Sequence, residues 1–264
     1  MKPYRITALK MGEAKATAAE VYWMSQQTGW ETLAFWAFLI ENDEHRILFN
    51  TGFPKDHLSQ RKHTPLRAGA GPDENVPVAA LEPDRWIVHV LTDRGLRADQ
   101  VDHILVTPLT AFATGGLEEF KAAQIWISRR GWVDFHTPDL EIPHMARNIV
   151  FSPQVLSWLM AEGVPRLRLL PDEESEILPG IRAWFCGGHH RSSMAFVVQT
   201  AAGRVALTDA IFKYRNYEEN IPLGLSESLE EHYHLFAKLR RDADLILPLY
   251  DPLLVERHPQ LVIG

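Results

Sequence analysis

Residues 101–116 read VDHILVTPLTAFATGG, and the organisation of the rest of the chain can be worked out from this stretch. Residues 101–107 are mostly apolar or β-branched, which predicts a strand buried on at least one face. Residues 108–116 are small or polar and include a proline and two glycines, which predicts a turn. Residues 117–120 predict the start of a short helix, so a strand leads through a turn into a helix here.

Further strands and helices are expected on both sides of this stretch. Residues 32–41 and 45–50 predict an antiparallel hairpin, and residues 81–96 an amphipathic helix. Downstream we expect strands over residues 124–128, 167–170, 176–178, 181–185, 194–200, 204–208 and 244–247. Helices are expected over residues 128–135, 152–163 and 226–242, with Ser152 and Ser226 as N-caps. Because strands followed by a helix occur in each half, the sequence predicts an α/β fold, a four-layer αββα sandwich, with residues 1–264 as one domain.

The composition argues against several classes of protein. The 264 residues carry 27 Lys and Arg against 34 Asp and Glu, a net charge of −7, which disfavours a nucleic-acid partner. The one cysteine, Cys186, excludes an internal disulfide and a Cys-rich metal site. There is no signal-peptide pattern, and no apolar run reaches the roughly 18 residues that span a bilayer. We expect a cytoplasmic protein that binds a small molecule, with no nucleic-acid or membrane partner and a homodimer as one possible assembly.

Some residues attract attention outside the regular elements. Residues 63–78 are rich in proline and glycine and predict a long loop of the kind that is often functional, although composition leaves open whether it forms a lid. Trp23 and Met24 stand in a polar loop, which favours an interface. Four histidines are expected at the surface or at helix caps: His136, His144, His232 and His234.

Five segments, in order, resemble the landmarks of the metallo-β-lactamase superfamily, most of all its lactonase-type hydrolases, which are N-acyl homoserine lactonase-like. They are ILFNTGFP at 47–54, VDHILVTPLTAFATGG at 101–116, FCGGHHRSS at 185–193, RVALTDA at 204–210 and ILPLYDP at 246–252. The resemblance covers roughly residues 32–260. It implies the αββα fold of that superfamily and a relationship to hydrolases of small lactones or esters.

The same resemblance implies that the usual metal site is degenerate. The family's motif places five His and two Asp around two metal ions. At the matching positions this chain has Pro108, Thr110, Phe112, Ala113 and Tyr250, and only His189 and Asp209 are retained. Outside the ligand set, Asn50 stands where the family has the Asp of its Asp-Thr-Gly segment. A zinc hydrolase needs about three protein ligands and an open position. We therefore expect no metal cofactor. A site rebuilt from His189, His190 and Asp209 is the alternative, but adjacent histidines on an extended loop are expected to point apart.

Two functional hypotheses remain open. In the first, the chain is a metal-independent hydrolase, with His189 and Asp209 as general base and orienting acid, and Thr110 or a water as nucleophile. Tyr250 or Asn50 would donate to the oxyanion. Thr107, Phe112 and His190 would line the substrate site.

In the second hypothesis the chain is a catalytically inactive binding or partner protein. Phe112 in place of a carboxylate makes the site more apolar, which favours an organic ligand over an activated water. His189 and Asp209 would then serve only to hold their loops together. A site filled by Phe112 and Tyr250 would support this hypothesis, and an open site with a polar floor would support the first.

Overall fold

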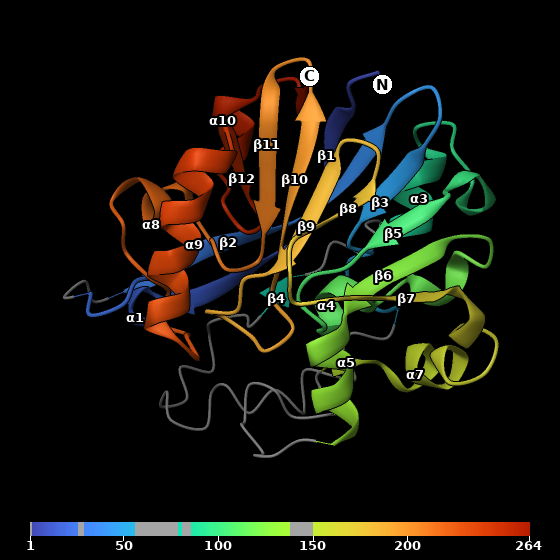
Figure 1. Ribbon diagram of the computed structural model, residues 1–264, viewed down its shortest axis with the longest axis horizontal. Helices are drawn as coiled ribbons and strands as arrows, with labels where there is room; N and C mark the ends of the chain where they lie inside the picture. Colours follow the sequence, from blue (N-terminus) through green and yellow to red (C-terminus); the bar gives the residue numbers. More distant parts are fainter. Residues whose placement is uncertain (1, 26–28, 56–78, 81–85, 138–149) are drawn as a thin grey trace.

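Two β-sheets pack face to face in the computed structural model, which describes residues 2–25, 29–55, 79–80, 86–137 and 150–264 (Figure 1). The larger sheet contains β1 (Arg5–Thr17), β2 (Trp30–Glu41), β3 (Arg46–Phe49), β4 (Ala79–Ala80), β5 (His103–Leu105), β6 (Gln124–Ser128), β7 (Leu167–Leu170) and β13 (Val262–Ile263). The smaller sheet contains β8 (Ser175–Leu178), β9 (Ile181–Phe185), β10 (Met194–Thr200), β11 (Gly203–Thr208) and β12 (Leu245–Pro248).

The strand order determines where loops can meet. The larger sheet has the order β13-β1-β2-β3-β5-β6-β7, and β3, β5, β6 and β7 run parallel. Parallel neighbours need crossover connections. The chain supplies α3 (Ile87–Thr92), α4 (Ala111–Thr114), α5 (Arg129–His136), α7 (Pro153–Leu159) and the 3-10 turns η3 (Ala98–Gln100), η4 (Leu117–Glu119) and η6 (Val164–Arg166). The smaller sheet has the order β12-β11-β10-β9-β8, and α8 (Tyr214–Glu218) and α9 (Leu229–Asp242) connect its parallel pair, β11 and β12.

Three apolar clusters hold four layers together. Between the sheets, the Phe49 ring meets Phe38 of its own sheet at 6.1 Å and Phe196 of the smaller sheet at 5.3 Å. On the outer face of the larger sheet, residues of α3 and α7 such as Ile87 pack against the strands. On the outer face of the smaller sheet, α9 contributes residues such as Phe236. The predicted αββα sandwich is confirmed.

Most predicted elements are present, and the differences lie at their ends. The strands β6, β7, β9 and β10 have the predicted bounds. Ser152 caps α7 as predicted, accepting the Val155 amide proton at 3.2 Å. The helix α9 begins at Leu229 rather than at residue 226, because Ser228 is the residue whose side chain caps it. Residues 63–78, and residues 81–85 of the predicted helix over 81–96, lie outside the described residues.

The strand β1 is the main element that the sequence pattern does not predict. It pairs with β2 along its whole length, but the register shifts between Lys10 and Gly12. Both Ala8 and Leu9 are buried, so apolar and polar residues do not alternate along this strand. A strand with an irregular register lacks the period of two by which strands are recognised.

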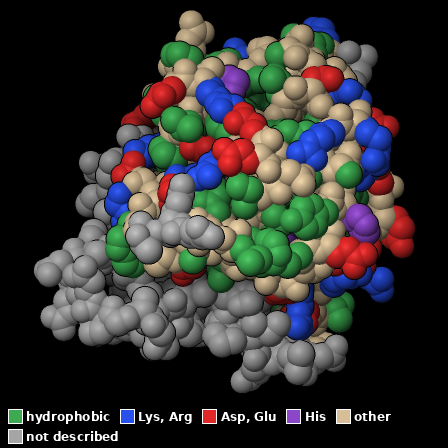
Figure 2. All heavy atoms as spheres, turned by 90° about the vertical axis from the view of Figure 1, so that its left-hand side faces the viewer, with side chains coloured by type: hydrophobic (Ala, Val, Ile, Leu, Met, Phe, Trp, Pro, Cys, Tyr) green, Lys and Arg blue, Asp and Glu red, His purple; other side chains and the backbone are tan. Residues whose placement is uncertain are grey.

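The face formed by α1 (Ala18–Val21), α8, α9 and α10 (Leu254–Arg257) is turned toward the viewer in Figure 2, where hydrophobic side chains lie among charges of both signs. Trp23 and Met24, which follow α1, are 38% and 77% exposed. Their predicted role in an interface stays a prediction. No helix in the described part of the chain is long and apolar enough to cross a membrane.

Candidate functional site

The loops at the ends of β3, β5, β9, β11 and β12 carry the predicted site residues. These residues are Asn50 after β3, Thr107, Thr110 and Phe112 after β5, His189 and His190 after β9, Asp209 after β11, and Tyr250 after β12. Seven of these side chains are buried, and Phe112 is half-buried. Hydrogen bonds or ring contacts link the residues that follow different strands, and Thr110 lies at the N-cap of α4, two residues before Phe112.

Asp209 is the polar centre of this site. The Thr107 hydroxyl donates to one carboxylate oxygen and the Ser193 hydroxyl to the other. Each hydroxyl accepts a backbone amide proton in turn, from Met194 at 2.8 Å and from His190 at 2.9 Å. Burial raises the pKa of Asp209 to about 7, although the two hydroxyl donors act in the opposite direction. Through these bonds Asp209 joins the end of β5 in one sheet to the start of β10 in the other.

Asn50 holds the backbone of Thr107 in place. Its φ of 58° lies in the left-handed region, which asparagine adopts more readily than most residues. Its side-chain oxygen accepts the Thr107 amide proton at 3.0 Å, and its amide nitrogen donates to the Thr107 carbonyl at 2.8 Å. The contacts of Asn50 therefore position Thr107, which in turn binds Asp209.

The loop after β9 places His189 against the segment between α8 and α9, which fixes the tautomer of its ring. Gly187 and Gly188 have φ values of 58° and 79°, and the Gly188 amide donates to the Glu231 carboxylate at 2.7 Å. The Nδ1 atom of His189 lies 2.9 Å from the Leu225 carbonyl oxygen. Because a carbonyl can only accept, Nδ1 carries the proton and Nε2 is the basic nitrogen of the neutral ring. The Leu225 carbonyl thus fixes the tautomer of His189. The sequence predicts this role for the Asp209 carboxylate instead.

The rings of His189 and His190 lie together, with centroids 3.8 Å apart and planes tilted by 41°. The prediction that these adjacent histidines point apart is wrong. The loop is not extended here, because left-handed glycines precede the pair and the Ser193 amide turns back to the His190 carbonyl at 2.9 Å.

An aromatic cluster surrounds the ring of Tyr250, a residue whose pKa responds to the charge of Asp209. It consists of Phe35, Phe53, Phe112, Phe212 and Tyr250. The Tyr250 ring meets Phe212 at 4.8 Å, Phe35 at 5.2 Å and Phe112 at 6.0 Å, all edge to face. Phe35 also meets Phe53 at 4.8 Å. The rings of Phe35, Phe53 and Phe112 are half-buried, whereas Tyr250 and Phe212 are buried, so the cluster runs inward from the surface.

Two hydroxyl groups of the site are buried without a hydrogen-bond partner among the described residues. They are the Tyr250 hydroxyl and the Thr110 Oγ1. Burial, and to a lesser degree the nearby charge of Asp209, raises the pKa of the Tyr250 hydroxyl well above its usual value. Tyr250 therefore stays protonated. Buried polar groups nearly always have a partner, so both hydroxyls suit a molecule that this chain binds.

The side chains at this site do not fit a zinc centre. Asp209 already accepts two hydroxyl protons, and aromatic rings occupy the Phe112 and Tyr250 positions. In the ranges that the structure describes, no three His, Cys, Asp or Glu residues are grouped so that they could hold a metal ion. The chemistry that these residues can offer is hydrogen bonding, apolar contact and proton transfer by His189.

Several residues of the site are not identified by the sequence reasoning. Ser193 lies at the end of the FCGGHHRSS segment, and the sequence pattern predicts no role for it. A hydroxyl on that loop is nevertheless a suitable donor to Asp209. Phe35 and Phe212 belong to patterns that read as core, and nothing in one sequence shows which core aromatics border a site. Leu225 acts through its carbonyl, which has no side-chain signature.

No protein-family model matches the chain. A curated relative, an N-acyl homoserine lactonase from Bacillus cereus, is 24% identical over 194 residues, which cover 73% of this chain and 70% of the relative. Among the solved structures that match the fold are two hydrolases. One is an N-acyl homoserine lactone hydrolase with N-hexanoyl-L-homoserine at its catalytic metal centre, with a TM-score of 0.75 and 18% identity over 97% of each chain. The other is a probable metal-dependent hydrolase from Staphylococcus aureus, with a TM-score of 0.71 and 13% identity over 95% of this chain and 90% of that one.

Proposed function

We propose that this chain, which has the metallo-β-lactamase fold, binds a small uncharged molecule of the lactone or ester class at the site around Asp209 without a metal ion. The observation that carries the proposal is the pair of buried hydroxyls, on Tyr250 and Thr110, that lack a partner among the described residues. A ligand carbonyl is an acceptor of the kind that such a hydroxyl lacks. A charged ligand group would be costly at this depth, which favours an uncharged molecule.

The aromatic cluster supports the same class of ligand. Its half-buried rings, Phe35, Phe53 and Phe112, lead from the surface toward Tyr250. Ligand sites of this kind combine apolar walls with a few polar groups that orient the ligand. A molecule with a carbonyl at one end and an acyl chain at the other would place the chain among these rings. The relatives are lactonases, so an N-acyl homoserine lactone is the first compound to test.

Hydrolysis is a second candidate function, and one observation favours it. The Leu225 carbonyl holds the proton on Nδ1 of His189, so Nε2 is the unprotonated nitrogen of the neutral ring. In this proposal Nε2 takes a proton from a water whose oxygen attacks the ligand carbonyl, while Tyr250 donates to the developing oxyanion. The C–O bond of the ester or lactone then breaks, and the proton passes from His189 to the leaving alkoxide.

Thermal melting of chelator-treated protein with N-hexanoyl homoserine lactone tests the binding proposal. We expect a saturable rise of the melting temperature in the wild type. Tyr250→Phe keeps the ring and removes the hydroxyl, so it should weaken binding about tenfold. Tyr233→Phe, at a half-exposed position on α9, is the matched control and should bind like the wild type. A response in Tyr250→Phe equal to that of the wild type would contradict the proposed site.

Chromatography of the ring-opened product distinguishes binding from hydrolysis. If the chain hydrolyses the lactone, His189→Ala should lower the rate at least a hundredfold, because general-base catalysis is worth about that much. Binding without turnover in the metal-free wild type would leave the chain as a binding protein. Turnover that disappears with the metal would contradict the metal-free mechanism.

A further inference from the structure

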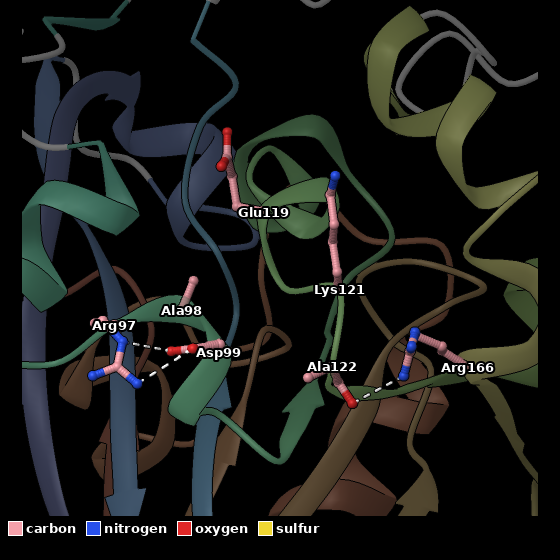
Figure 3. Close-up of a pocket in the computed structure, with 7 residues that line it drawn as sticks. All are labelled: Arg97, Ala98, Asp99, Glu119, Lys121, Ala122 and Arg166. Atoms are coloured by element: carbon pink, nitrogen blue, oxygen red, sulfur yellow. Dashed lines mark hydrogen bonds and ion pairs between the residues drawn. The ribbon is translucent and has the colours of Figure 1, made fainter.

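A cavity of about 470 Å³ lies at the amino ends of three parallel strands. We call it the amino-end cavity; it is lined by Arg97, Ala98, Asp99, Glu119, Lys121, Ala122 and Arg166 (Figure 3). These residues stand on η3, on η4 and the turn before β6, and on η6, and so precede β5, β6 and β7. The site around Asp209 follows β5 at its other end. The amino-end cavity therefore lies at the opposite ends of these strands from the Asp209 site. The proposed function does not involve it.

The charges around this cavity do not cancel. The Arg97 guanidinium pairs with both oxygens of Asp99, at 3.0 and 3.3 Å. The Glu119 carboxylate pairs with Lys55 at 2.7 Å. Each acid of the lining is thus matched by a cation, and Lys121 and Arg166 are left over.

Lys121 and Arg166 form no ion pair within the part of the chain that the structure describes. Arg166 donates one N–H to the Ala122 carbonyl at 3.0 Å, which orients the guanidinium and leaves its other donors available. In the view of Figure 3, Lys121 and Arg166 lie on one side of the cavity and the Arg97–Asp99 pair on the other. Two cations without an acidic partner form a local positive site on a chain whose net charge is −7.

We propose that the amino-end cavity binds a small molecule carrying one oxyanion group, a phosphate or a carboxylate, which Lys121 and Arg166 contact. A lysine supplies a compact charge and an arginine a planar fork, and together these are the common means of holding such groups. The cavity is larger than a bare phosphate and lies within the range of small-molecule sites. The methyl groups of Ala98 and Ala122 line the remainder, and Asp99 and Glu119 can accept from hydroxyl or amine groups of the ligand.

Melting curves in graded phosphate or acetate, at constant ionic strength balanced with chloride, test this proposal. Constant ionic strength is needed because general screening also changes stability. We expect a saturable rise of the melting temperature with at least one of the two anions. Lys121→Gln and Arg166→Gln should each raise the half-saturating concentration about tenfold, and the double variant should not respond. Saturation with phosphate alone assigns a phosphate group, and saturation with acetate alone assigns a carboxylate.

Two further variants make the test selective. Arg166→Lys keeps the charge but loses the planar fork, so it should fall between Arg166→Gln and the wild type. Arg241→Gln removes an exposed arginine on α9 that donates to the Ala237 carbonyl of its own helix, and it should respond like the wild type. All variants change exposed or half-buried side chains, and equal melting temperatures without added anion verify their folding. No saturation with either anion, or an undiminished response in the double variant, would overturn the proposal.

Discussion

At the scale of single residues, the environment of Asp209 is the most informative. The sequence identifies Asp209 and Thr107 as parts of one site, because both end strands whose loops are expected to meet. It does not reveal that the carboxylate accepts from Thr107 and Ser193. Which hydroxyls face one carboxylate depends on the distance between two sheets, and no local pattern encodes that distance.

The buried carboxyl predicts a pH dependence of stability. The pKa of Asp209 in the folded chain is about 7, above its ordinary value, so its contribution to stability is complete at low pH and is lost as the pH rises through 7. Asp209→Asn removes this titration. Relative to the variant, the wild type should lose roughly 3 kcal/mol of unfolding free energy between pH 5 and pH 8.

Urea unfolding of the wild type and of Asp209→Asn across that pH range measures the difference between their free energies of unfolding. The other titrating groups contribute equally to both proteins, so their effects cancel in this difference. Asp93→Asn, at an exposed position after α3, serves as the control and should show no such change. A wild-type-minus-variant difference that is flat with pH would show that Asp209 is ionised throughout the range.

At the scale of elements, α9 and the loop after β9 act as one unit. His232 was expected at the surface, and that expectation is wrong: the residue is fully buried, with its ring against Gly188, and burial lowers its pKa to about 4. The helix was predicted from its capping and charge pattern. Those patterns do not reveal that a glycine loop lies on its first turns, because contact with a glycine leaves no side-chain signal.

This contact predicts an unequal cost for two glycine substitutions. A Cβ on Gly187 would lie 2.0 Å from the Glu231 carboxylate, whereas a Cβ on Gly95 would meet nothing within 4 Å. Both glycines have a left-handed φ, so both alanine variants bear the same backbone strain of roughly 1 kcal/mol. Gly187→Ala should cost roughly 2 kcal/mol more, since Glu231 must also release the Gly188 amide. Chemical denaturation of the two variants measures this difference, and equal costs would mean that the loop moves freely away from α9.

Local patterns account well for the elements with regular periods. The hairpin of β2 and β3, and the strands β6, β9 and β10, follow from short apolar runs between turn residues. The strand β1 could not be predicted in the same way, because its register shifts and its buried residues do not alternate. The start of α9 was misplaced because Ser226 and Ser228 are equally good N-caps, and Ser226 instead donates to the Gly188 carbonyl at 3.0 Å.

At the scale of the whole molecule, the fold matches that of metal-dependent enzymes, while the side chains at its centre favour other interactions. The sequence alone supports this conclusion through the substitutions at Pro108, Phe112 and Tyr250. It does not show that the aromatic residues pack ring to ring with Phe35, since Phe35 lies far away in the chain.

If metal plays no part in this fold, chelation should leave it unaffected. We expect the melting temperature to be unchanged after dialysis against EDTA, and purified protein to hold far less than one equivalent of zinc, iron or manganese by plasma mass spectrometry. His189→Ala should have the same metal content as the wild type. A stoichiometric metal that is lost in this variant would contradict the ligand count.

The aromatic cluster also has an evolutionary consequence. An aspartate at position 112 would put a carboxylate against the rings of Phe35 and Tyr250, apolar surroundings in which a buried charge is costly. A histidine at position 250 alone would leave Phe212 and Phe35 with a gap beside them. Each single substitution toward a metal site therefore destabilises the fold. Several must occur together before the binding of a metal ion can offset the loss of stability. The edge-to-face packing of these rings therefore opposes any single substitution toward the metal ligands of the family.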